Sequence, residues 1–185
     1  MNGWKRTGRG ARTRVVATLE GQETAVLRGL VAEVVRMLDA RSAEHPRDEL
    51  AELTGLATGP STKPDDPVLA RLLPEFSTDD TALSGALRTL HEPALIAAKH
   101  DAAAVVLRTL PPAGGRVELS GPEADAWLTA LNDVRLALGT ALDVSEDMPD
   151  ELPPDDPRAG HLGVYHWLTF VQDGLVRARS ALPSG

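Results

Sequence analysis

The sequence predicts a mainly α-helical domain of five or six helices, with a small two-stranded β element. The chain has 185 residues, which suits one domain, and 42% of them are apolar, which is enough to fill a core without a metal or a disulfide. Long stretches place apolar residues at i, i+3, i+4 and i+7, the spacing of one helix face. Only two short stretches have the composition of a strand.

The first strand is predicted at residues 12–19 (RTRVVATL), which are rich in β-branched side chains and partly alternate between polar and apolar. A helix is predicted next, over residues 22–41, because its apolar residues form one broad stripe: Val26, Leu27, Leu30, Val31, Val34, Val35 and Leu38. Residues 42–63 mix prolines and glycines with a few leucines, which predicts a loop containing one helical turn.

Three helices are predicted in the middle of the chain. The first begins at Asp66-Pro67, because a carboxylate at the cap accepts hydrogen bonds from free backbone amides, and proline in the first turn loses none. Pro93 is expected to end the second helix and to begin a third, which is apolar nearly all round and should be buried. The three predicted ranges are 66–73, 77–91 and 93–110.

A second strand is predicted at residues 116–119 (RVEL), and a lone strand needs a partner, so we expect the two strands to pair. The clearest local signal follows directly. Ser120 and Glu123 form the pattern of a capping box, with Pro122 in the first turn, which predicts a well-defined helix that ends near residue 142.

An acidic, proline-rich loop is predicted at residues 143–160. Its first 15 positions hold seven acidic residues, four prolines and no basic residue, a composition that buries too little surface to form a helix or strand. The last helix is predicted over residues 162–182. The body of the protein is therefore expected to be a single mainly α domain spanning residues 15–182.

Charge divides the chain into two parts. The first 14 residues carry five positive charges and no negative ones, whereas the remaining 171 residues carry 14 basic and 27 acidic side chains, a net charge of −13. We expect residues 1–14 to be a basic, flexible arm, and one interpretation is that this arm contacts DNA phosphates. The alternative is that the arm lies loosely against its own acidic body. The candidate nucleic-acid contacts are Lys5, Arg6, Arg9, Arg12 and Arg14.

Several chemistries are excluded or disfavoured by the sequence. The chain has no cysteine, so thiolate metal sites, disulfides and thiol nucleophiles cannot occur within it. His91-Glu92 begins like a zinc-protease motif, but Leu95 occupies the position of the second imidazole. We expect no metal, cofactor or enzymatic activity. No apolar run approaches 18 residues and no secretory signal is present, which predicts a cytoplasmic protein without a membrane partner.

Three polar residues interrupt the apolar helix that follows the capping box: Asn132, Asp133 and Arg135. Such residues must reach solvent or find partners. One interpretation is an internal ion pair or cap contact, and the other is a contact with a ligand or partner protein. No base, nucleophile or oxyanion donor accompanies them in the sequence, so they do not predict a catalytic site.

Three segments carry a resemblance: residues 66–74 (DPVLARLLP), residues 126–140 with AWL and LNDVRLALGT, and residues 165–169 (YHWLT). They resemble an actinobacterial family of domains of formerly unknown function, commonly encoded beside the ClpS adaptor. One branch of it is described as oxidative-stress transcription regulators of the AosR type. The resemblance covers about residues 12–180.

The resemblance implies a non-enzymatic transcription regulator of the stress response. It would act through contacts with a sigma factor or RNA polymerase, or with promoter DNA. Apart from the resemblance, we expect the domain to be a homodimer. The redox-sensing branch is associated with a cysteine switch, which this chain cannot contain. The alternative is an adaptor or accessory factor of Clp proteolysis that does not bind DNA. The resemblance supplies no catalytic residues and no cofactor.

Overall fold

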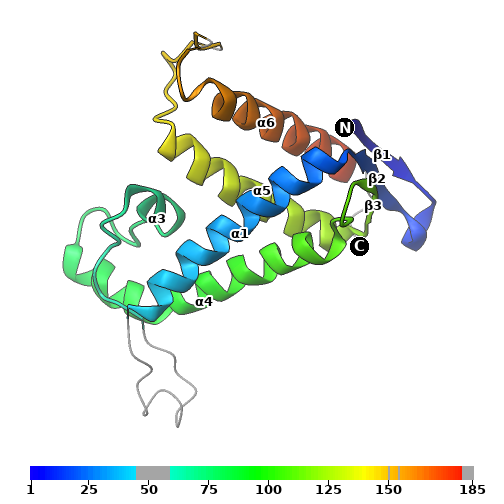
Figure 1. Ribbon diagram of the computed structural model, residues 1–185. Coiled ribbons are helices and arrows are strands. Elements are labelled where there is room, and N and C mark those ends of the chain that lie inside the picture. Colours follow the sequence, from blue (N-terminus) through cyan, green and yellow to red (C-terminus); the bar gives the residue numbers. More distant parts are fainter. Residues whose placement is uncertain (45–58, 150, 154, 181–185) are drawn as a thin grey trace.

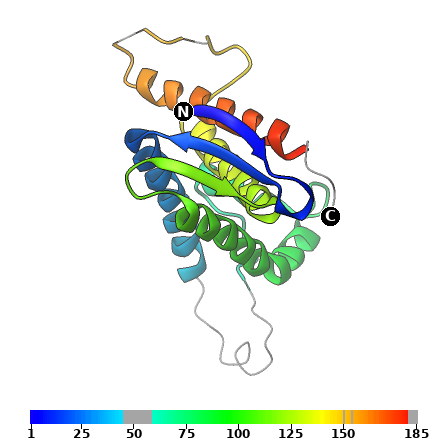
Figure 2. The same ribbon diagram turned by 90° about the vertical axis from the view of Figure 1, so that its right-hand side faces the viewer.

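The computed structural model describes residues 1–44, 59–149, 151–153 and 155–180. Within them lie four long helices and one short one, and a three-stranded sheet covers one end of the helices (Figures 1 and 2). The helices are α1 (Gly21–Ala43), α3 (Pro67–Leu72), α4 (Thr81–Thr109), α5 (Gly121–Ala141) and α6 (Ala159–Ser180). The strands are β1 (Asn2–Thr7), β2 (Arg14–Leu19) and β3 (Gly115–Leu119). The mainly α prediction is confirmed.

The sheet is antiparallel with the order β1-β2-β3. The predicted pairing of the two strands is confirmed, with Val15 opposite Leu119 and Leu19 opposite Gly115. Alternate residues of β2 and β3 belong to the hydrophobic core, so this face of the sheet packs on the helices: Val15, Ala17, Leu19, Val117 and Leu119. The two-stranded prediction was wrong because β1 adds a third strand.

The strand β1 replaces the flexible arm that we expected at residues 1–14. Trp4 is 9% exposed, and its indole Nε1 donates a hydrogen bond to the backbone oxygen of Val171 in α6, at 3.0 Å. Its ring meets the edge of Trp127 at 5.6 Å between centroids. Gly174 leaves room for Trp4, because a Cβ there would lie 3.2 Å from the indole. A single buried tryptophan fixes this strand, and residues 2–7 show no apolar alternation that would predict it.

The helix α5 lies in the middle of the molecule, in contact with α1, α3, α4 and α6 (Figure 1). Its Trp127 is completely buried, and the indole Nε1 donates to Thr109 Oγ1 at 2.8 Å. The predicted capping box at its start is confirmed: Ser120 accepts from the Glu123 amide, and the Glu123 carboxylate accepts from the Ser120 amide at 2.9 Å. The hydrogen bonds from Ser120 lower the pKa of Glu123.

The helix α4 runs without a break through Pro93, so the prediction of two separate helices was wrong. A proline inside a helix leaves the carbonyl four residues earlier without its amide partner. Here that carbonyl belongs to Thr89, and it accepts a hydrogen bond from the Gly59 amide at 2.8 Å. The connecting chain can approach the Pro93 ring this closely because residue 59 is a glycine. A Cβ at this position would lie only 3.0 Å from the ring. The compensating donor comes from a distant segment, which local rules do not reveal.

The described residues 143–149, 151–153 and 155–158 lie between α5 and α6. Because α6 begins at Ala159, three residues before the predicted start, the last two residues of the predicted acidic loop belong to this helix. Within the described part of the chain, no helix has both the length and the apolar composition needed to cross a membrane.

Candidate functional site

The five candidate nucleic-acid residues lie on one hairpin. Lys5 and Arg6 are in β1, Arg9 and Arg12 are in the connection, and Arg14 is in β2. Four of them are exposed, and Arg14 is half-buried. The structure therefore presents these charges on a folded element, at the end of the molecule shown in Figure 2.

The face of the sheet turned away from the helices extends this basic surface. Lys5 pairs with Val16 of β2, and Arg116 of β3 pairs with Thr18. Between these strands lies a shallow hollow of about 110 Å³, which both Lys5 and Arg116 line. Glu118, which accepts from Arg116 at 3.2 Å, supplies the opposing charge beside it. Arg6 pairs with the core residue Val15 and so lies on the other face of the sheet. We name Lys5, Arg9, Arg12, Arg14 and Arg116 together the basic sheet face.

Asn132, Asp133 and Arg135 do not form one cluster. Asn132 is exposed, whereas Asp133 is 3% exposed and accepts a hydrogen bond from Lys99 of α4, at 2.6 Å between Nζ and Oδ1. Burial raises the pKa of Asp133, and the bond to Lys99 opposes that shift. The pair of Lys99 and Asp133 joins α4 to α5. Of the two interpretations, an internal ion pair or a contact with a partner, the internal ion pair is the one that applies to Asp133.

Arg135 points instead toward α6. Its Nη1 donates to Gln172 Oε1 at 2.7 Å, and its guanidinium lies 5.5 Å from the centroid of the Tyr165 ring. Both Arg135 and Tyr165 line a pocket of about 320 Å³, which Arg71 lines from its place on α3. The three segments that carry the family resemblance, separate in sequence, therefore converge on one pocket.

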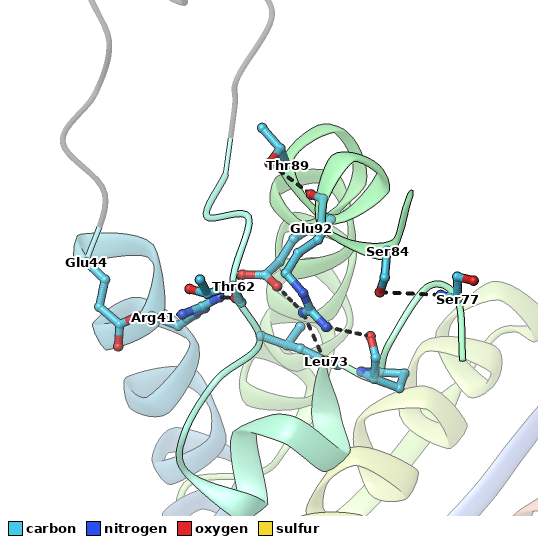
Figure 3. Close-up of polar contacts among 11 residues, drawn as sticks. Arg41, Glu44, Thr62, Leu73, Ser77, Ser84, Thr89 and Glu92 are labelled. Carbon is cyan, nitrogen blue, oxygen red and sulfur yellow. Dashed lines mark hydrogen bonds and ion pairs between the residues drawn. The ribbon is translucent and has the colours of Figure 1, made fainter. Parts of the chain in front are cut away.

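A buried ion cluster that sequence reasoning missed lies where α1 meets α4 (Figure 3). Glu92 is fully buried between two arginines. The Nε of Arg41 donates to its Oε1 at 2.8 Å, and Nη1 of Arg88 donates to its Oε2. Glu44 lies at the surface and accepts from Arg41 Nη1 at 2.6 Å, so a second carboxylate balances the second guanidinium.

The same two arginines hold the chain that connects α1 with α4. Arg88 donates to the backbone oxygens of Leu73 at 3.2 Å and Pro74 at 3.1 Å, and Arg41 donates to the backbone oxygen of Thr62. Side-chain donors thus satisfy three carbonyls of irregular backbone, and the one that belongs to Leu73, a residue only 1% exposed, would be costly to bury alone. These contacts give the cluster a structural role.

Only one local signal could have indicated this cluster. Arg88 and Glu92 are four residues apart and therefore face each other on a helix. Arg41 is 51 residues from Glu92, so no sequence pattern connects them. In the sequence, Glu92 stands beside His91 as the start of a metal motif and carries no signal of a buried ion pair with Arg41. Among the residues that the structure describes, no group of three or more histidine, aspartate or glutamate side chains is placed to hold a metal ion.

Comparison with known proteins gives the family. Residues 1–179 match a family model described as "Domain of unknown function (DUF2017)". The "Oxidative stress regulator AosR" of Mycobacterium tuberculosis is 43% identical over 186 residues, which cover 94% of this chain and 85% of that protein. The "Putative oxidative stress regulator AosR" of Mycobacterium leprae is 41% identical over 193 residues, covering 96% and 88%. No solved structure matches significantly. The chain belongs to the DUF2017 family.

Proposed function

We propose that this chain is a non-enzymatic regulator of the oxidative stress response, acting through contact with a sigma factor or RNA polymerase and through promoter DNA. The observation that carries the proposal is the similarity to proteins named oxidative stress regulators, at 43% identity along 94% of the chain. A regulator that contacts RNA polymerase works in the cytoplasm. Because the chain has no cysteine, it has no thiol of its own with which to sense the stress.

The basic sheet face supports the DNA part of the proposal. Five positive charges occur in the first 14 residues, and Arg116 extends the surface onto β3, while the rest of the chain carries an excess of acidic residues. Phosphate contacts on this face would orient the acidic body away from the nucleic acid. Affinity for DNA would then fall steeply as the salt concentration rises.

An exposed apolar stripe on α4 supports the protein-contact part. Leu83 is 49% exposed and Leu90 is 55% exposed, and exposed Ala86 and Ala94 continue the same helix face. This stripe lies in the half of α4 that is farther from the sheet (Figure 1). The molecule can therefore contact DNA at one end and a protein at the other.

The DNA contact is tested by neutralising charges on the hairpin of the full-length chain. Deleting residues 1–14 would not be a clean test, because it removes β1 and the buried Trp4. Replacing three exposed residues is expected to weaken DNA binding for all sequences and to reduce the salt slope by up to about three, or about one for each lost phosphate contact. The variant combines Lys5→Gln, Arg9→Gln and Arg12→Gln.

Fluorescence anisotropy with labelled promoter DNA at two salt concentrations provides the measurement. The matched control removes the same charge from the body of the molecule through Lys63→Gln, Arg36→Gln and Arg177→Gln, all at exposed positions. Equal losses in the two variants, or an absence of binding by the unmodified chain, would remove DNA from the proposal.

The protein contact is tested by pull-down of purified RNA polymerase with and without sigma factor. Charges on the α4 stripe, introduced as Leu83→Asp with Leu90→Asp, are expected to weaken retention at least about tenfold, because each leucine would lose its apolar burial. The control places charges at two exposed positions of α6, as Phe170→Asp with Val176→Asp. A parallel pull-down with purified Clp subunits distinguishes the alternative: retention of Clp subunits but not of polymerase would contradict the proposal and favour the proteolysis adaptor.

A further inference from the structure

The pocket between α3, α5 and α6 is lined by more hydrogen-bond donors than acceptors. It holds about 320 Å³, which is within the range of sites for small molecules. Two guanidinium groups and a phenol line it, from Arg71, Arg135 and Tyr165. The opposing charge is the carboxylate of Asp143, at the end of α5, so the lining carries a net positive charge in a body that is otherwise acidic.

The donors of this pocket are not used up by the protein itself. Within the described residues, the Arg71 side chain and the Tyr165 hydroxyl make no hydrogen bond or ion pair. Nη1 is the one nitrogen of the Arg135 guanidinium that makes a hydrogen bond in the same part of the chain, to Gln172. Guanidinium N–H groups and a hydroxyl that have no acceptor in the protein leave donor capacity for a ligand.

Arg135 is held in place before any ligand arrives. Its bond to Gln172, at 2.7 Å, and its position over the Tyr165 ring fix the plane of the guanidinium. Gly139 makes this packing possible, because a Cβ there would lie 3.2 Å from Tyr165 Cε2. A guanidinium fixed in this way loses little side-chain entropy when it binds an oxyanion with two parallel hydrogen bonds.

We propose that this pocket binds a small molecule through an oxyanion, a carboxylate or phosphate group, held between Arg71 and Arg135. The two arginines come from different elements, α3 and α5, so the ligand links the short helix to the centre of the fold. The limited volume favours a small metabolite over a polymer. The inference is independent of the proposed DNA and polymerase contacts, because none of the pocket residues belongs to either surface.

The test is isothermal titration of the full-length chain with inorganic phosphate and, separately, with citrate, at constant ionic strength. Saturable binding of either probe is expected, and Arg71→Gln should weaken it at least about tenfold, the effect of losing hydrogen bonds to a charged group. Arg71→Lys keeps the charge but not the paired geometry and should weaken binding less. Because Arg71 is exposed, its replacement should leave the fold unchanged.

The matched control is Arg177→Gln, an exposed arginine twelve residues beyond Tyr165 on α6, which should bind as the unmodified chain does. Arg135→Gln is a second test, with its folding checked by circular dichroism. Binding of phosphate alone indicates a phosphoryl ligand, and binding of citrate alone indicates a carboxylate. Failure of both probes to saturate, or equal weakening by Arg71→Gln and Arg177→Gln, would overturn the proposal.

Discussion

Replacing Glu92 by glutamine is expected to lower the free energy of unfolding by about 3 to 5 kcal/mol, the range for breaking a buried ion pair by removing one partner. Glu92 is fully buried, and both of its arginine partners are at most 3% exposed. Glutamine keeps the shape but removes the charge, and it replaces one of the two acceptor oxygens by an NH2 group, which would face a guanidinium that can only donate. Two buried positive charges would then lack their shared counter-charge.

Urea unfolding of the unmodified chain and the variant, followed by circular dichroism, measures this loss. The control is Glu33→Gln on α1, where Glu33 is half-exposed and pairs with the exposed Arg36. A surface pair of this kind contributes less than about 1 kcal/mol, so the control should change stability little. A Glu92→Gln loss no larger than that of Glu33→Gln would show that the cluster does not stabilise the fold.

The role of the cluster also explains why apolar replacements should not restore stability. Exchanging a buried ion pair for apolar residues is often neutral, because the desolvation cost disappears together with the attraction. Here Arg88 also satisfies the carbonyls of Leu73 and Pro74, and Arg41 satisfies that of Thr62. An apolar cluster would leave these three carbonyls without donors. The arginines are therefore needed for the connecting chain as much as for Glu92.

The parts of the fold that sequence reasoning predicted are those set by local rules. The stripe of α1, the capping box of α5 and the start of α3 at Asp66 depend on residues within about one helical turn of each other. The parts that it missed depend on distant contacts. The strand β1 is fixed by the contact of its Trp4 with α6. The helix α4 continues through Pro93 because the Gly59 amide supplies the hydrogen bond that the Thr89 carbonyl would otherwise lack.

The same distinction applies to the candidate site. Composition identified the five basic residues of the hairpin. Only the pairing of β1 with β2 shows that they lie on a folded sheet. The family resemblance included Arg71, Arg135 and Tyr165, but only the packing of three helices brings them to one pocket. The sequence places Asp133 with its neighbours Asn132 and Arg135, whereas its partner Lys99 is 34 residues away.

Removing either member of the Lys99–Asp133 pair is expected to cost about 3 kcal/mol or more, because it leaves the other charge buried without its partner. Asp133 is 3% exposed, and the Lys99 side chain is 12% exposed. The double variant Lys99→Met with Asp133→Leu removes both charges and should be close to the unmodified chain in stability, or above it. Urea unfolding of the four proteins forms a double-mutant cycle, and additive losses would contradict the expected coupling.

The raised pKa of Asp133 adds a pH dependence with a definite sign. Burial penalises the charged carboxylate more than the bond to Lys99 favours it, so folded Asp133 binds its proton at pH values where an unfolded aspartate, with a pKa of about 3.9, has lost it. Between the pKa of the unfolded aspartate and the higher pKa of folded Asp133, the folded state holds more protons than the unfolded state, and stability falls as pH rises.

The double variant Lys99→Met with Asp133→Leu lacks this titration, while the other carboxylates are common to both proteins. The stability of the unmodified chain relative to the double variant should therefore decline from pH 4 to pH 7, and a relative stability that rises over this range would show that Lys99 outweighs burial.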